Sequence, residues 1–100
     1  MTEDDQLYRE IDRARQAQEL IEHPLLREAL DTYRQRLQAE WSASPARDTE
    51  GRERLWLMVK TVEVVEQHLK ELIETGKLAT VQLERKRSAI ERAREWISTL

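Results

Sequence analysis

Histidine, serine and carboxylate side chains could carry chemistry in this sequence, and their spacing argues against a catalytic or metal site. The two histidines, His23 and His68, have no partner three or four residues further on that would complete a metal motif. No serine lies in a strand-turn-helix context that would activate it as a nucleophile. With 20 acidic and 17 basic residues, carboxylate pairs arise by chance, and no glycine-rich phosphate loop is present. We therefore predict no enzyme activity, no catalytic residues, no cofactor and no metal ion.

The sequence also lacks features of disulfide-bonded, exported or membrane-spanning proteins. It contains no cysteine, which excludes disulfides and cysteine-based zinc sites and fits a reducing cytosol. The acidic start, residues 1–5, is followed by no apolar run and does not resemble a signal peptide. The longest apolar stretch, residues 55–59, is far too short to span a bilayer. We expect a cytoplasmic protein without a membrane partner.

One basic cluster lies near the C-terminal end of the sequence. The net charge is −3, yet residues 77–100 contain six basic and three acidic side chains. Backbone contact with nucleic acid would use the side chains of Arg85, Lys86, Arg87, Arg92 and Arg94. The simpler interpretation is a solvated helix face near a helix C-terminus, where cations are favoured. We expect at most weak, non-specific nucleic-acid binding.

Tryptophans and a polar segment between them are the candidates for a protein interface. Trp41 and Trp56 flank residues 42–51, so we expect them to approach each other and either close a core or anchor a partner. Leu57 adds an apolar group on a second helix face. The polar segment itself is either a recognition tip or a capped turn with internal salt bridges. The predicted partner interface comprises Trp41, Arg47, Asp48, Arg52, Trp56 and Leu57.

Helices must position these residues, because every apolar stripe follows a spacing of three or four residues. Charged residues make up 37% and hydrophobic ones 39%, with only two glycines, two prolines and no phenylalanine. Thr2 with the acidic residues after it predicts the N-cap of a helix over 3–22. The dipeptide His23-Pro24 predicts either the start of a new helix or a kink in a continuous one. The segment after it is predicted to be helical over about 25–42, and Pro24 would belong to its first turn.

The second half of the sequence predicts the strongest core-forming helix. We expect helices over 50–75 and 78–98, with Gly76 as a C-cap; the alternative keeps Gly76 inside one continuous helix at a cost of about 1 kcal/mol relative to alanine. In the predicted core, Val62, Val65 and Leu69 are buried against Leu30, Tyr33 and Leu37.

The predicted fold is all-α, an antiparallel helical hairpin or small bundle with coiled-coil character and three to four helices. Residues 1–100 form a single domain, divided into an N-terminal helix (1–23), a second helix (24–42), a loop (43–51), a core helix (52–76) and a basic C-terminal helix (77–100). Such an elongated arrangement cannot cover every apolar side chain, which favours a homo-oligomer with a dimer as the simplest form. The alternative is a compact four-helix monomer in which the N-terminal helix folds back.

Two runs of sequence resemble a known family. The run from Arg47 to Glu53, Arg-Asp-Thr-Glu-Gly-Arg-Glu, and the run from Glu74 to Ala79, Glu-Thr-Gly-Lys-Leu-Ala, are its most specific parts. Over residues 20–97 the sequence resembles a family of small helical proteins encoded by tailed bacteriophages and prophages, whose genes lie among those for packaging and head assembly.

This resemblance implies a phage structural or assembly factor that contacts other phage structural or packaging proteins. It would act in the cytoplasm of the bacterial host or in the virion, and the resemblance implies no catalytic residues. The alternative is a nucleic-acid-binding protein of DNA packaging that uses the basic C-terminal helix. A small inhibitor of a host protein would have a similar sequence.

Overall fold

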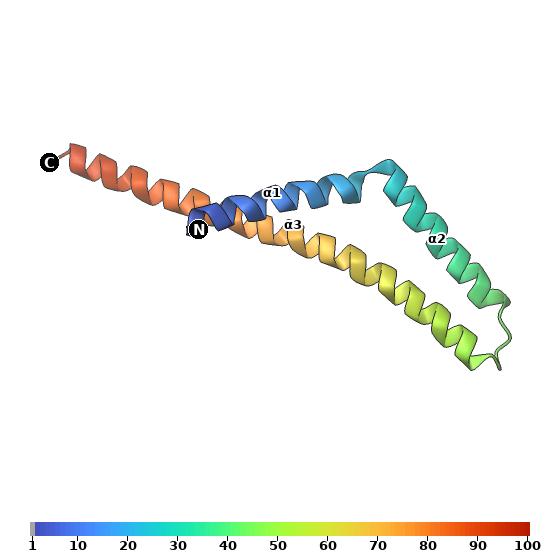
Figure 1. Cartoon of the computed structure of the whole chain (residues 1–100). Coiled ribbons are helices and arrows are strands. Elements are labelled where there is room, and N and C mark those ends of the chain that lie inside the picture. Colours follow the sequence, from blue (N-terminus) through green and yellow to red (C-terminus); the bar gives the residue numbers. More distant parts are fainter. Residues whose placement is uncertain (1) are drawn as a thin grey trace.

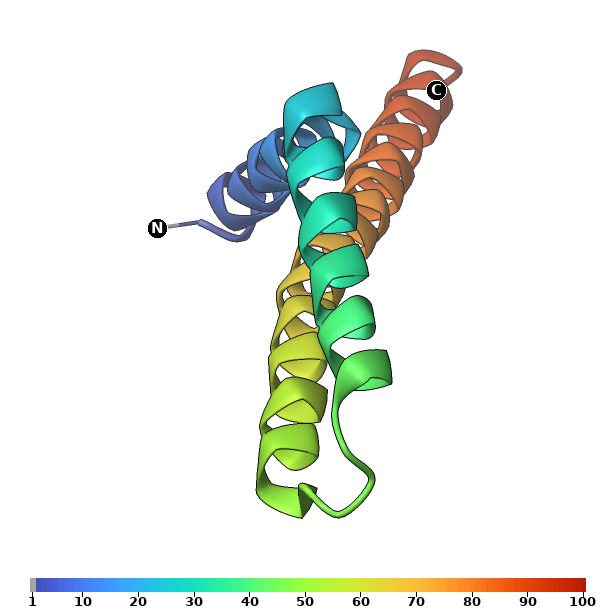
Figure 2. The same cartoon turned by 90° about the vertical axis from the view of Figure 1, so that its right-hand side faces the viewer.

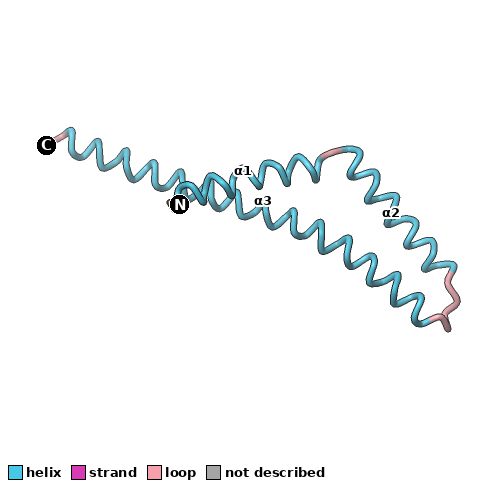
Figure 3. The backbone as a smooth tube through the Cα atoms, viewed as in Figure 1, coloured by secondary structure: helices cyan, strands magenta, loops and turns pink. Residues whose placement is uncertain are grey.

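The computed structural model describes residues 2–100 as an all-α protein, as predicted. The described residues form three helices: α1 (Glu3–Glu22), α2 (Pro24–Ala43) and α3 (Thr49–Ser98) (Figure 1). Within residues 2–100 there is no strand, and the only non-helical segments are the chain ends and the two connections (Figure 3).

Local sequence signals explain where α1 and α2 begin. Thr2 caps α1: its hydroxyl accepts a hydrogen bond from the Asp5 backbone N–H at 3.1 Å, and the Asp5 carboxylate accepts one from the Thr2 N–H at 3.3 Å. His23 takes an extended conformation between the helices, and its Nδ1 accepts a hydrogen bond from the Leu25 N–H at 3.2 Å. Pro24 lies in the first turn of α2. Of the two alternatives for this dipeptide, separate helices are therefore correct.

The loop between α2 and α3 is shorter than the predicted 43–51. α2 continues to Ala43 and α3 already begins at Thr49. The Asp48 carboxylate caps α3 by accepting a hydrogen bond from the Gly51 N–H at 3.1 Å. A Cβ at position 51 would meet only this carboxylate, which would then have to shift.

The predicted helix break at Gly76 is wrong, and the alternative of one continuous helix is correct. α3 runs through residues 76–78 without interruption and is 50 residues long. Gly76 is buried against α1, and a Cβ there would overlap the Cβ of Ala14 and lie 3.2 Å from the Glu10 carbonyl oxygen. The glycine therefore serves helix packing and not helix termination.

The helices form an elongated molecule with principal extents of 80 × 26 × 22 Å. α1 and α2 run back along α3, and the C-terminal part of α3 projects beyond the N-terminus of α1 (Figure 1). Seen from the end where α2 joins α3, α1 crosses α3 at an angle, so that the N-terminus and the far end of α3 diverge (Figure 2). The buried apolar side chains are few: Leu7, Ala17, Leu37 and Ala79.

The predicted core is only partly correct. Leu37 is buried, while Leu30, Val62 and Leu69 are half-buried. Val65 is 55% exposed, so its predicted burial is wrong, and Tyr33, one of the residues against which it was predicted to pack, is 42% exposed. Glu66 takes the place expected for Val65, because the half-buried positions of α3 here are 59, 62, 66 and 69. Val65 lies one residue away, about 100° round the helix, and points outward.

Candidate protein-interaction surfaces

An apolar groove, here called the tip groove, lies between α2 and α3 near the loop that connects them. It has a volume of about 300 Å³, and its walls come from both helices: Arg34, Leu37, Gln38, Trp41, Leu55, Trp56 and Val59. Trp41 and Trp56 thus meet at one groove, as expected for residues that flank the same short loop. Both rings stay open to solvent, with 46% and 55% of their surface exposed. Half-exposed tryptophans in an apolar groove are typical anchors for a protein partner.

Cations hold the two tryptophan rings of the tip groove. The Arg52 guanidinium lies 4.0 Å from the centre of the Trp41 ring and also donates to the Ser44 carbonyl oxygen and hydroxyl at 3.3 and 3.2 Å. The Lys60 ammonium lies 5.5 Å from the centre of the Trp56 ring. Cation–π contacts of this kind stabilise an exposed ring in one orientation. Arg52 therefore positions Trp41 and ties the end of α2 to α3.

The other predicted interface residues do not line the tip groove. Asp48 caps α3, and Arg47 is exposed in the loop. Leu57 is 52% exposed but lies outside the groove walls, because it follows Trp56 and is turned away from α2. The interface prediction missed the groove walls Leu37, Leu55 and Val59, because apolar residues spaced three or four apart are typical of a helix core. The position of Trp41 and Trp56 could have indicated these walls, because each tryptophan lies next to apolar residues of the same helix.

The predicted basic cluster is split by an ion pair with α1. The Lys86 ammonium lies 2.8 Å from an Asp4 carboxylate oxygen and 3.3 Å from one of Glu3. The hydrogen bond to Asp4 raises the pKa of Lys86 above its ordinary value of 10.5, and the hydrogen bond to Glu3 acts in the same direction. Lys86 therefore holds the start of α1 against α3.

The remaining cations of this cluster are exposed and lie among carboxylates. Arg87 and Arg94 line a groove of about 350 Å³ together with Asp4, Tyr8 and Glu91. Arg85 and Arg92 are exposed on α3. Mixed signs along this groove weaken the attraction for a polyanion such as DNA.

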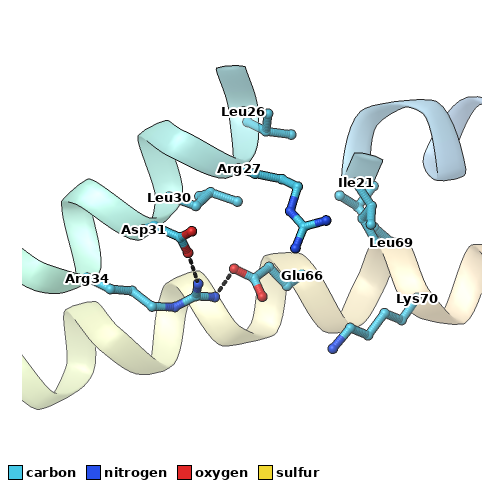
Figure 4. Close-up of a pocket in the computed structure, with 9 residues that line it drawn as sticks. All are labelled: Ile21, Leu26, Arg27, Leu30, Asp31, Arg34, Glu66, Leu69 and Lys70. Atoms are coloured by element: carbon cyan, nitrogen blue, oxygen red, sulfur yellow. Dashed lines mark hydrogen bonds and ion pairs between the residues drawn. The ribbon is translucent and has the colours of Figure 1, made fainter. Parts of the chain in front are cut away.

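A further cavity lies at the junction of α1 and α2, where both helices face α3. It has a volume of about 240 Å³ and is lined by Ile21, Leu26, Arg27, Leu30, Asp31, Arg34, Glu66, Leu69 and Lys70 (Figure 4). Arg34 forms ion pairs with Asp31, at 3.3 Å, and with Glu66 across the helices. The pair with Glu66 joins α2 to α3, whereas the pair with Asp31 lies within α2.

Residues 2–100 contain neither a metal-binding cluster nor a helix that could span a membrane. No group of three or more histidine or carboxylate side chains there could hold a metal ion. Along the same stretch of chain, none of the helices contains a segment apolar enough to cross a bilayer.

The geometry therefore defines an elongated all-α protein with exposed apolar surfaces. No protein-family model matches the sequence, and no curated protein or solved structure gives a significant match. The resemblance to phage proteins accordingly stays a prediction.

Proposed function

We propose that the protein is a non-enzymatic structural or assembly factor of tailed bacteriophages or prophages that acts through protein–protein contacts as an oligomer. The tip groove is the observation that carries the proposal. It presents two half-exposed tryptophans on a frame tied by Arg52, with apolar walls from two helices. Rigid aromatic anchors of this kind give protein interfaces much of their binding energy.

The elongated shape supports an assembly role. A molecule 80 Å long with a thin cross-section exposes many large apolar side chains and buries few, and it can bridge partners that lie far apart. The expected partners are other phage structural or packaging proteins and further copies of this chain. The site of action would be the bacterial host cytoplasm or the virion.

The test is to follow the protein through particle assembly. The phage or prophage that encodes it would be induced, and heads, assembly intermediates and mature particles would be separated and analysed by mass spectrometry. We expect the protein in at least one of these fractions, bound to a structural or packaging protein. Trp56→Ala should reduce this association at least tenfold, since it removes an exposed anchor. Absence from every fraction would overturn the proposal.

A nucleic-acid role is the second candidate, because the exposed side chains of Arg85, Arg87, Arg92 and Arg94 lie on one stretch of helix. Fluorescence anisotropy with duplex DNA near physiological salt separates the two functions. We expect only weak binding, since the net charge is −3. Submicromolar affinity that is lost on charge reversal at Arg85 and Arg87 would favour the packaging role.

A further inference from the structure

The contacts between α1 and α3 follow one antiparallel register. Asp4 pairs with Lys86, Ala14 packs on Gly76, and Ile21 shares a cavity with Leu69, so the residue numbers of each pair add up to 90. The stripe of α3 that α1 covers is Leu69, Leu72, Gly76, Ala79, Leu83 and Lys86, with spacings of three and four. This is the periodicity of a helix that packs along another helix.

The same periodicity continues where α1 has ended. Ile90, Ala93 and Ile97 follow Lys86 on α3 at spacings of four, three and four, and Leu100 follows three residues later, just beyond the end of α3 at Ser98. We call these four residues the C-terminal stripe. α1 begins at Glu3, level with position 87 of α3, and every residue from 87 to 100 is exposed. Ile90, Ile97 and Leu100 expose 55%, 63% and 87% of their surface. The C-terminal stripe is therefore the uncovered continuation of an established helix–helix contact.

We propose that a second copy of this chain covers the C-terminal stripe by antiparallel pairing of the two α3 ends around a two-fold axis. This inference deepens the proposed function, since it rests on the oligomer that the function includes. Self-pairing with Ile90 level with Leu100 of the second copy also places Ala93 level with its Ile97. A small side chain then faces a large one, as packing of two helices at close distance requires.

The balanced charge of this segment favours a second copy over a strongly charged partner as the occupant. Residues 88–100 contain two acidic and two basic side chains, Glu91, Arg92, Arg94 and Glu95, so two such segments carry no net repulsion. Glu91 lies one turn before Arg94 on the flank of the stripe, so this flank carries both signs. A polyanion would gain little from a neutral segment.

The second copy also fits end to end with α1. In the proposed register, Leu100 of the second copy lies level with Ile90. α1 begins at Glu3, which lies level with position 87, so the second copy and α1 occupy neighbouring parts of α3 without overlap. At this point a groove of about 350 Å³ offers apolar surface from Tyr8, Leu83 and Ile90. The paired segments, residues 90–100 of each copy, span about 15 Å at 1.5 Å per residue. An interface this short lies below about 1,200 Å², so we expect micromolar affinity.

Sedimentation velocity of the purified chain from about 1 to 500 µM tests the proposal. The mass should rise with concentration from 11.9 kDa toward twice that value. Ile97→Glu should raise the dissociation constant at least tenfold, because it places a charge in the paired stripe. Val64→Glu is the matched control: Val64 is 67% exposed, lies on α3 away from the stripe, and should leave the constant unchanged.

Cysteine pairing tests the direction of the helices, since the natural sequence has no cysteine. Ala93→Cys chains mixed with Ile97→Cys chains should form mixed disulfides, at least fivefold in excess over disulfides between identical chains. A parallel pair would give the reverse, because identical positions then face each other, and this result would overturn the antiparallel arrangement.

The remaining outcomes separate this inference from the proposed function. If Trp56→Ala dissociated the dimer and Ile97→Glu did not, the contact between the two copies would lie at the tip groove. This result would overturn the C-terminal pairing. A monomer at every concentration would also overturn it. Neither result bears on whether the protein is found in phage particles, which tests the function separately.

Discussion

At the scale of single residues, Gly76 shows how the contact with α1 overrides helix propensity. Alanine at an exposed helix position is more favourable than glycine by about 1 kcal/mol. At position 76, however, the added methyl group would overlap Ala14 of α1. We therefore expect Gly76→Ala to lower the free energy of unfolding by about 1–3 kcal/mol, as overpacking does in well-packed contacts.

Urea unfolding followed by circular dichroism measures this effect. Ser88→Ala, at an exposed position of the same helix, serves as the control and should change the free energy of unfolding by less than about 0.5 kcal/mol. If Gly76→Ala instead stabilised the protein, α1 would not pack closely on α3 at this point.

The cap of α3 gives a second prediction at this scale. Asp48→Ala removes the acceptor for the Gly51 N–H and should lower the free energy of unfolding by about 0.5–2 kcal/mol. Asp48→Asn keeps a capping oxygen and should retain most of the stability. Thermal or urea unfolding of the three proteins gives the comparison. Equal losses for both substitutions would mean that the charge, and not the cap, is what stabilises this end of α3.

At the scale of helices, Lys86 links α1 to α3 through Asp4 and Glu3. Because this pairing raises the pKa of Lys86, its contribution to stability is fully present below about pH 10.5 and is lost as the pH rises through the higher pKa of the folded state. We expect Lys86→Gln to lower the urea midpoint at pH 7, and the difference from the wild type to disappear above the folded-state pKa.

Lys77→Gln provides the control for this measurement. Lys77 pairs only with Glu74 of the same helix, and both side chains are 68% exposed, so its loss should leave the docking of α1 unchanged. Hydrogen exchange at neutral pH locates the effect. Faster exchange confined to the N-terminal half of α1 in Lys86→Gln is the expected result, and unchanged exchange there would contradict the linking role.

Leu37 is the one buried side chain of α2. Leu37 is only 4% exposed, so Leu37→Ala should lower the free energy of unfolding by about 2–5 kcal/mol. Val65→Ala removes a side chain that is 55% exposed and should cost less than about 0.5 kcal/mol. Chemical denaturation of the two variants compares them directly. A similar loss in the free energy of unfolding for both variants would mean that Val65 is buried, as the sequence predicted.

At the scale of the whole molecule, shape distinguishes this fold from the compact four-helix alternative. The Cα radius of gyration is 22.3 Å, whereas a compact domain of 100 residues has about 13 Å. Small-angle X-ray scattering at low micromolar concentration, where the monomer prevails, should give a value near 22 Å. A value near 13 Å would show that the chain folds back on itself in solution.

The sequence by itself determined the all-α class and the cap at Thr2. It also narrowed His23-Pro24 to a new helix or a kink, and the segment around Asp48 to a capped turn or a recognition tip. These features depend on hydrogen bonds and backbone preferences that act within four residues, so local residue types are enough to predict them. The meeting of Trp41 and Trp56 was also predictable, since a short loop brings its flanks together. The tip groove could not be predicted from the sequence. Its apolar walls have the spacing of core residues, and only the structure shows that they stay open to solvent.

Only the tertiary structure decided the role of Gly76, the outward position of Val65 and the bare end of α3. Glycine followed by lysine has the local chemistry of a helix end, and the approach of Ala14 from a distant helix makes it a contact point instead. Likewise, a regular stripe such as Ile90 to Leu100 has the same spacing whether it is covered or exposed. The length of α1 decides which part of the stripe is covered, because α1 begins level with position 87 and reaches no further.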